Sequence, residues 1–298
     1  MITDISIDKR AAIFVCTVIA ALLLAACGPT GGQGTGGKIG VVVTILPQQE
    51  FVYSVGGEMV DVTVMVPPGA SPHTYEVTPL QMSKLSRAKM YAKVGSPIEF
   101  ELTWLDKLIA ANRNMLVVDC GKGIQMAQST DLDEPGLDPH IWTSVRNVKI
   151  MVNNICQGLV QVDPASRQYY EGNRDAYLEK LDALDADIRA ALDGAKQRTF
   201  IVYHPAWGYF ARDYGLEQLG IEQEGKEPKA AYMTRMINQA KAKDIKVVFV
   251  SPEFDTRSAE AVAREINGRV VIIDPLAKDY VKNMRAIAAA LKEATQRQ

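Results

Sequence analysis

The sequence predicts an α/β fold of two lobes, each with a mainly parallel β-sheet flanked by helices, joined by one long helix. Three observations lead to this prediction. From Lys38 onward, short β-rich runs alternate with stretches of helical periodicity, which is typical of parallel sheets. The alternation occurs in two separate regions. Between them lies one helical stretch of about 30 residues, so that we expect a helix long enough to span both regions.

The first region covers residues 38–162. Its β-rich runs are short and mostly aliphatic, and each is followed by a stretch in which apolar residues recur every three or four positions. We predict strands at 39–45, 60–66, 90–94 and 115–119 and helices near 79–87, 97–111 and 144–160.

The long helix is expected within residues 163–195. It starts at Asp163-Pro164, a capping residue followed by the proline that is favoured in a first helical turn, and it ends near Gly194. One apolar stripe runs along it: Tyr177, Leu181, Leu184, Ile188 and Leu192. Such a helix measures roughly 45 Å and therefore holds the two lobes at a fixed relation.

The second region covers residues 196–298 and repeats the alternation of the first. We predict strands at 199–203, 247–251 and 270–273 and helices near 206–214, 232–243, 258–266 and 279–292. With mainly parallel strands, the carboxyl ends of each sheet form the edge at which ligands bind in open α/β folds.

The N-terminus reads as an export signal in residues 1–26. Lys9 and Arg10 precede an apolar run at 11–26 that is shorter than the roughly 20 residues needed to span a bilayer. The segment Leu24-Ala25-Ala26-Cys27 resembles a bacterial lipoprotein box, in which the cysteine becomes lipid-modified. The alternative is an ordinary cleaved signal with an incidental cysteine. The glycine-rich segment 27–37 is a flexible linker, so we expect a domain tethered to the outer face of the cytoplasmic membrane.

Composition excludes one large class of function. The net charge of −2 and the pI near 6.0 provide no basic surface of the kind that neutralises phosphates, so no nucleic-acid partner is expected. Of the four cysteines, Cys16 lies in the predicted signal and Cys27 is the predicted anchor, which leaves Cys120 and Cys156. They pair only if their Cα atoms come within bridging distance, and we predict two buried free thiols instead.

The chain has three histidines, and each one follows a strand or precedes a helix. His73 lies in a proline-rich loop after a strand, His140 lies in a turn before a helix, and His204 directly follows a strand. Asp274 follows the last predicted strand in the same way. Three imidazoles and one carboxylate would form a closed four-coordinate metal site between the lobes.

Four segments around these residues resemble the metal-site motifs of the zinc and manganese solute-binding proteins of ABC importers. They are Pro72-His73-Thr74-Tyr75-Glu76, Asp138-Pro139-His140-Ile141-Trp142, the segment 203–216 and Asp274-Pro275-Leu276-Ala277. The resemblance covers nearly the whole mature chain. It implies a rigid backbone helix between two lobes and one metal ion in the cleft, bound by His73, His140, His204 and Asp274. It also implies a permease and an ATPase as partners, and we expect a monomer.

A set of three histidines and one aspartate suits zinc, whereas manganese prefers more oxygen ligands. We therefore predict Zn²⁺ as the cargo, with Mn²⁺ or iron as the alternative in the same importer class. Glu76, Asp138 and Glu224 are candidates to orient the imidazoles, because a metal-bound histidine usually donates its other N–H to a carboxylate or carbonyl. The sequence departs from the family where Val77 replaces a proline, and it lacks the family's histidine-rich loop in 121–137.

Two other classes of function compete with this interpretation. The first is a zinc enzyme, since three histidines with an open fourth position also hold catalytic zinc. Against it, the chain has no His-Glu-x-x-His or Gly-x-Ser-x-Gly motif, and Asp274 would close the open position, so we predict no enzymatic activity. The second is a surface adhesin, because an anchored exported domain is also suited to binding another protein.

Overall fold

The computed structural model of the chain describes residues 37–129, 136–222 and 229–296. The predicted export signal, Cys27, most of the linker and Glu224 lie outside these ranges. From Lys38 onward the chain forms one compact unit. No helix within the described ranges combines the length and the apolar composition needed to cross a membrane.

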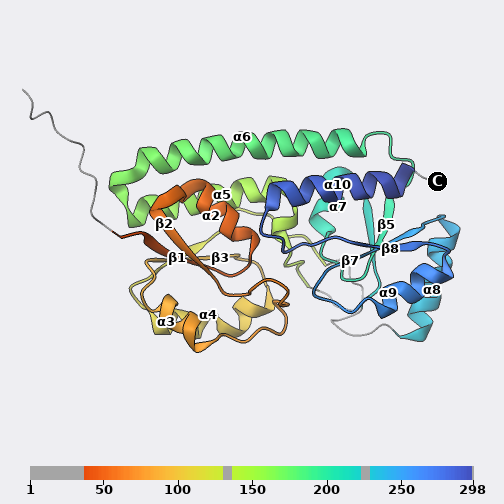
Figure 1. Cartoon of the computed structure of the whole chain (residues 1–298), viewed down its shortest axis with the longest axis horizontal. Helices are drawn as coiled ribbons and strands as arrows, with labels where there is room; N and C mark the ends of the chain where they lie inside the picture. The colour runs from red at the N-terminus through yellow and green to blue at the C-terminus, as the bar shows by residue number, and fades with distance from the viewer. Residues whose placement is uncertain (1–36, 130–135, 223–228, 297–298) are drawn as a thin grey trace, which may run out of the picture. The chain divides into compact units, whose positions relative to one another are not determined.

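Two parallel sheets of four strands form the framework, which confirms the predicted fold class (Figure 1). The first sheet has the order β2-β1-β3-β4 and the second the order β6-β5-β7-β8, so the two sheets share one topology. The strands are β1 (Ile39–Val43), β2 (Val60–Val64), β3 (Met90–Lys93), β4 (Leu116–Asp119), β5 (Thr199–Val202), β6 (Glu217–Gly220), β7 (Val247–Val250) and β8 (Arg269–Ile272). In each sheet the first strand lies between the second and the third, and ligands of such sheets bind beside this switch point.

Helices flank both sheets. They are α2 (Pro47–Gly56), α3 (Pro79–Leu85), α4 (Glu99–Ala111), α5 (Val145–Val162), α6 (Arg167–Leu192), α7 (Gly208–Tyr214), α8 (Ala230–Ala242), α9 (Arg257–Glu265) and α10 (Tyr280–Gln296). Three 3₁₀ turns accompany them in the described ranges: η1 (Gly57–Met59), η2 (Ile141–Thr143) and η3 (Pro164–Ser166). We call the elements from β1 to α5 the first lobe and those from β5 to α10 the second lobe.

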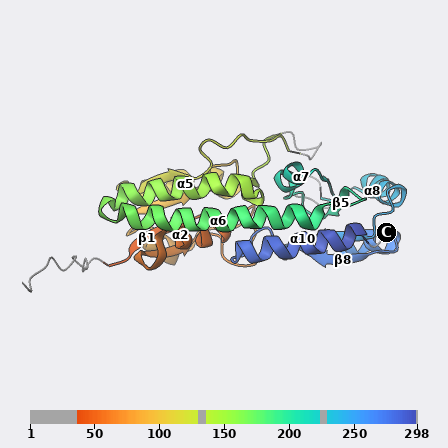
Figure 2. The same cartoon turned by 90° about the horizontal axis from the view of Figure 1, so that it is seen from above.

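The long helix α6 is present as predicted, and the 3₁₀ turn η3 precedes it. Its 26 residues measure about 39 Å at 1.5 Å per residue. Its buried stripe is Tyr170, Tyr177, Leu181, Leu184, Ile188 and Leu192. In both views α6 lies alongside α5 of the first lobe and α10 of the second (Figures 1 and 2).

The two lobes share one apolar core. A single buried cluster contains Val41 and Val43 of the first sheet, the inward side chains of α5 and α6, and Val202 and Phe249 of the second sheet. Cys120 and Cys156 belong to it as buried free thiols, as predicted. Because close-packed interiors have low compressibility, this shared core fixes the relative position of the loops that end at the cleft.

Two elements are absent from the sequence prediction. Helix α2 begins at Pro47, a residue favoured in the first turn, and it buries Phe51, Val52 and Val55 against the sheet. Strand β6 has the sequence Glu-Gln-Leu-Gly, which carries little intrinsic strand preference. It forms because its backbone pairs with β5 along four residues, and such pairing outweighs local propensity.

Candidate metal centre

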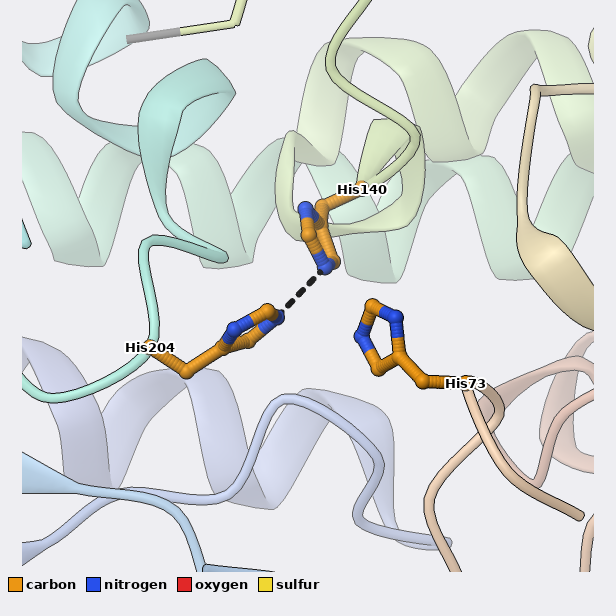
Figure 3. A group of neighbouring side chains, drawn as sticks. All are labelled: His73, His140 and His204. Carbon is orange, nitrogen blue, oxygen red and sulfur yellow. Dashed lines mark hydrogen bonds between the residues drawn. The ribbon is translucent and has the colours of Figure 1, made fainter. Parts of the chain in front are cut away.

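The three histidines come from three different segments and converge at one point (Figure 3). His73 lies in the loop between β2 and α3, His140 directly precedes η2, and His204 is the second residue after β5. One ring nitrogen of each lies within 4.8 Å of those of the other two. The Nε2 atoms of His140 and His204 are 3.1 Å apart. The His73 ring centroid lies 5.0 Å from that of His204 and 6.5 Å from that of His140.

Each imidazole also contacts a carboxylate through Nδ1. Asp138 lies 2.8 Å from Nδ1 of His140, and Glu222 lies 2.8 Å from Nδ1 of His204. Glu99 lies 3.0 Å from Nδ1 of His73. A carboxylate at Nδ1 holds the proton there, so the Nε2 lone pair remains available as a ligand.

Two of these carboxylates were not identified from the sequence. Glu99 is the first residue of α4, whose start was predicted two residues earlier. Glu222 follows β6, and it reaches His204 because β5 and β6 are parallel neighbours whose carboxyl ends meet. Recognising 217–220 as a strand would have indicated Glu222. Glu76, which was a candidate for such a contact, is exposed.

Burial shapes the protonation of the centre. Desolvation lowers the pKa of His204 below its ordinary value, and this effect outweighs the opposing hydrogen bond to Glu222. Burial alone would raise the pKa of Glu99, but its hydrogen bond to His73 and the charge of that imidazole hold the pKa below the ordinary value. The centre therefore favours a neutral His204, which is the form that binds metal ions.

The segment that carries His140 is attached to the second lobe. The Tyr209 hydroxyl of α7 accepts a hydrogen bond from the Ala127 N–H at 3.0 Å and donates one to the Asp138 carbonyl at 2.9 Å. A Cβ atom on Gly208 would lie 2.5 Å from the Asp138 carboxylate, so a larger residue would displace this carboxylate. These contacts hold His140 beside His204.

Asp274 follows β8 but is not part of the histidine group in this structure. Its carboxylate accepts a hydrogen bond from the Leu276 N–H at 2.7 Å. It lines a cavity of about 360 Å³ between the lobes, together with Glu253. Burial raises the pKa of Asp274, and burial together with the neighbouring Asp274 raises the pKa of Glu253 to about 7, so Glu253 is partly protonated near neutral pH.

The histidine group separates two other cavities. A cavity of about 230 Å³ contains Glu99, Leu102 and Asp138 in its wall, and a small one of about 20 Å³ contains Trp142, Glu253 and Phe254. The three histidines are the only described residues that line both. Three convergent imidazoles with a carboxylate nearby can hold a divalent transition metal between them.

Comparisons with known proteins agree with this geometry. The model of a family described as zinc-uptake complex component A, periplasmic, matches residues 41–294. The high-affinity zinc uptake system protein ZnuA of Bacillus subtilis is 30% identical over 283 residues, covering 87% of this chain and 87% of that protein. A crystal structure of a ZnuA deletion mutant with zinc bound superimposes with a TM-score of 0.83 at 41% identity, covering 88% of this chain and 99% of the other.

The zinc-binding lipoprotein AdcA of Streptococcus pneumoniae is 29% identical over 305 residues. The match covers 93% of this chain but 59% of AdcA, so the chain corresponds to little more than half of that relative. The similarity therefore concerns a segment of AdcA rather than the whole protein.

Proposed function

This chain belongs to the family of the periplasmic component A of zinc-uptake complexes, and we propose that it is an extracytoplasmic receptor that binds Zn²⁺ and delivers it to an ABC importer. The observation that carries the proposal is the convergence of His73, His140 and His204, each with a carboxylate at Nδ1. Such carboxylates orient metal-binding imidazoles and raise their basicity.

We propose the three histidines as ligands and Zn²⁺ as the cargo. A tetrahedral zinc ion with bonds of ~2.0–2.1 Å separates its ligand atoms by ~3.4 Å. The 3.1 Å between the Nε2 atoms of His140 and His204 is close to this value, and a small shift of His73 completes the triangle. Three nitrogen ligands favour zinc over manganese, which prefers oxygen.

Asp274 is the proposed fourth ligand. To coordinate the ion, Asp274 exchanges its hydrogen bond with the Leu276 N–H for a metal bond. The next residue, Pro275, is held near the histidine segment, because its carbonyl accepts a 2.8 Å hydrogen bond from Trp142. With four protein ligands no position remains for an activated water, so we propose binding without catalysis.

The remaining assignments concern the cell envelope. We propose that residues 1–26 are the export signal, that Cys27 carries the lipid anchor and that 27–37 links it to the lobes 38–162 and 196–298. A permease and an ATPase are the proposed partners of a monomeric receptor. The names of the relatives, a zinc uptake protein and a zinc-binding lipoprotein, support this location.

The test is metal content and competitive affinity of the purified full chain for Zn²⁺ and Mn²⁺. We expect one tightly bound zinc per chain, weakened by more than ~100-fold in His204→Ala, because losing a ligand costs more than the ~10–100-fold typical of its outer partners. Glu217→Gln is the control, since Glu217 bonds Thr199 and Lys243 at the opposite end of β6. A wild-type chain that binds manganese in preference to zinc, or neither, contradicts the proposal.

A further inference from the structure

The small cavity beside the histidines has a mostly apolar wall. Apart from the histidines, its wall contains the side chains of Ile98, Trp142, Phe254, Pro275 and Leu276, with Pro72, Ser71 and Glu253. Its volume is about 20 Å³. A cavity needs roughly 10–15 Å³ to hold one water, so this one has room for about one small ligand.

Phe254 forms the wall on the side of the second lobe. Its ring stacks on His204 with centroids 4.9 Å apart and an angle of 27° between the planes. It also contacts the Tyr203 ring at 5.4 Å. The turn after β7 is fixed by the hydrogen bond from the Phe254 N–H to the Ser251 carbonyl at 3.2 Å. The ring is thus held against one of the proposed ligands.

The proposed fourth ligand approaches from this same side. Asp274 precedes Pro275 and Leu276, which line the small cavity, and Glu253 lines both it and the 360 Å³ cavity of Asp274. With Asp274 as the fourth ligand, the coordination positions opposite the three imidazoles face the 20 Å³ space, which Pro275 and Leu276 line, rather than the 230 Å³ cavity on the other side of the histidines. A six-coordinate ion needs three oxygen ligands there, whereas a tetrahedral ion needs one.

We propose that Phe254 determines the selectivity of the site by limiting the bound ion to four ligands. This inference rests on the proposed zinc-receptor function and adds the residue that excludes manganese. With the ring in place, one carboxylate fills the space and water is shut out. Without it, the cavity admits the additional waters that Mn²⁺ requires.

The test compares Phe254→Ala and Phe254→Leu with the wild-type full chain. Zn²⁺ and Mn²⁺ affinities are measured by competition, and Co²⁺ is used as a spectroscopic probe, because four-coordinate Co²⁺ absorbs visible light far more strongly than six-coordinate Co²⁺. Leu102→Ala is the matched control. It also removes an apolar side chain, but from the wall of the 230 Å³ cavity on the other side of the histidines.

We expect Phe254→Ala to lower the ratio of zinc to manganese affinity by about tenfold or more, which equals ~1.4 kcal/mol. Its Co²⁺ absorption should weaken, Phe254→Leu should lie between it and the wild type, and Leu102→Ala should match the wild type. If the alanine variant does not fold, Phe254→Val provides the same comparison.

Two results overturn the inference, and they differ. Tight zinc binding by the wild type together with an unchanged affinity ratio and strong Co²⁺ absorption in a folded Phe254→Ala variant refutes the role of Phe254 and leaves the receptor function intact. A wild type that holds no stoichiometric zinc refutes the proposed function itself, and the selectivity inference with it.

Discussion

Replacing Glu222 by glutamine tests how far the carboxylates at Nδ1 contribute to zinc binding. Glu222 lies 2.8 Å from Nδ1 of His204, and its side chain is only 5% exposed. Glutamine has nearly the same shape and retains an acceptor oxygen, so the variant removes the charge while it keeps the hydrogen bond. It therefore isolates the charge-assisted part of this contact.

The magnitude follows from the two kinds of hydrogen bond. A bond to a charged group contributes ~1.5–3 kcal/mol and a neutral one ~0.5–1.5 kcal/mol, so the change costs ~1–1.5 kcal/mol. This corresponds to about a 5- to 12-fold weaker zinc affinity, at the lower end of the range known for such partners. The metal-free protein should not lose comparable stability, because the variant also removes the cost of burying a charge.

The assay is competition against a chelator of known affinity at one pH, combined with thermal unfolding of the metal-free protein. Glu217→Gln makes the same chemical change at the opposite end of β6, where Glu217 bonds Lys243, and should leave the affinity unchanged. An unchanged affinity in Glu222→Gln, or a loss of affinity that parallels a loss of metal-free stability, refutes the reasoning.

Three further outcomes are expected. Zinc affinity falls from pH ~7.5 to ~5 because the imidazoles must be neutral to bind; chelator competition across this range measures the change, and a flat curve contradicts it. Stability of the metal-free protein is no test of this effect, because burial lowers the pKa of His204 but raises that of Glu253 to about 7, and these two shifts change the stability in opposite directions as the pH falls. Asp274→Asn weakens zinc binding by ~10-fold or more, since it replaces the proposed anionic ligand; an unchanged competition curve shows that Asp274 is not a ligand. Tyr209→Phe leaves the Ala127 N–H and the Asp138 carbonyl without this partner, so urea unfolding should detect a loss of ~1–3 kcal/mol in the free energy of unfolding. Equal urea midpoints for the variant and the wild type would show that these hydrogen bonds do not stabilise the fold.

Most of the fold could be predicted from the pattern of the sequence. The aliphatic runs that became β1, β5 and β7 are fully or largely buried, and buried parallel strands are continuous apolar runs. The stripe of α6 has the helical period over about six turns, which makes a long helix the easiest element to recognise. Strand β6 escaped prediction because Glu217 and Gln218 favour no strand locally, and only pairing with β5 makes them one.

The candidate site, like the fold, could be predicted from the sequence only in part. The positions of His73, His140 and His204 at the ends of strands and loops indicated the histidine group before any geometry was known, because the carboxyl ends of parallel strands share one edge. The contacts of Glu99 and Glu222 could not be predicted, since each depends on the side-by-side placement of segments distant in the sequence.

By itself, the sequence determined the alternation of strands and helices, the long connecting helix and the three imidazoles, because these depend on local periodicity and on residue type. Only the tertiary structure decided which carboxylates meet the imidazoles, where Asp274 lies, and how little space Phe254 leaves beside His204. Distances between segments are fixed by the packing of the whole core, and a one-dimensional pattern does not contain them.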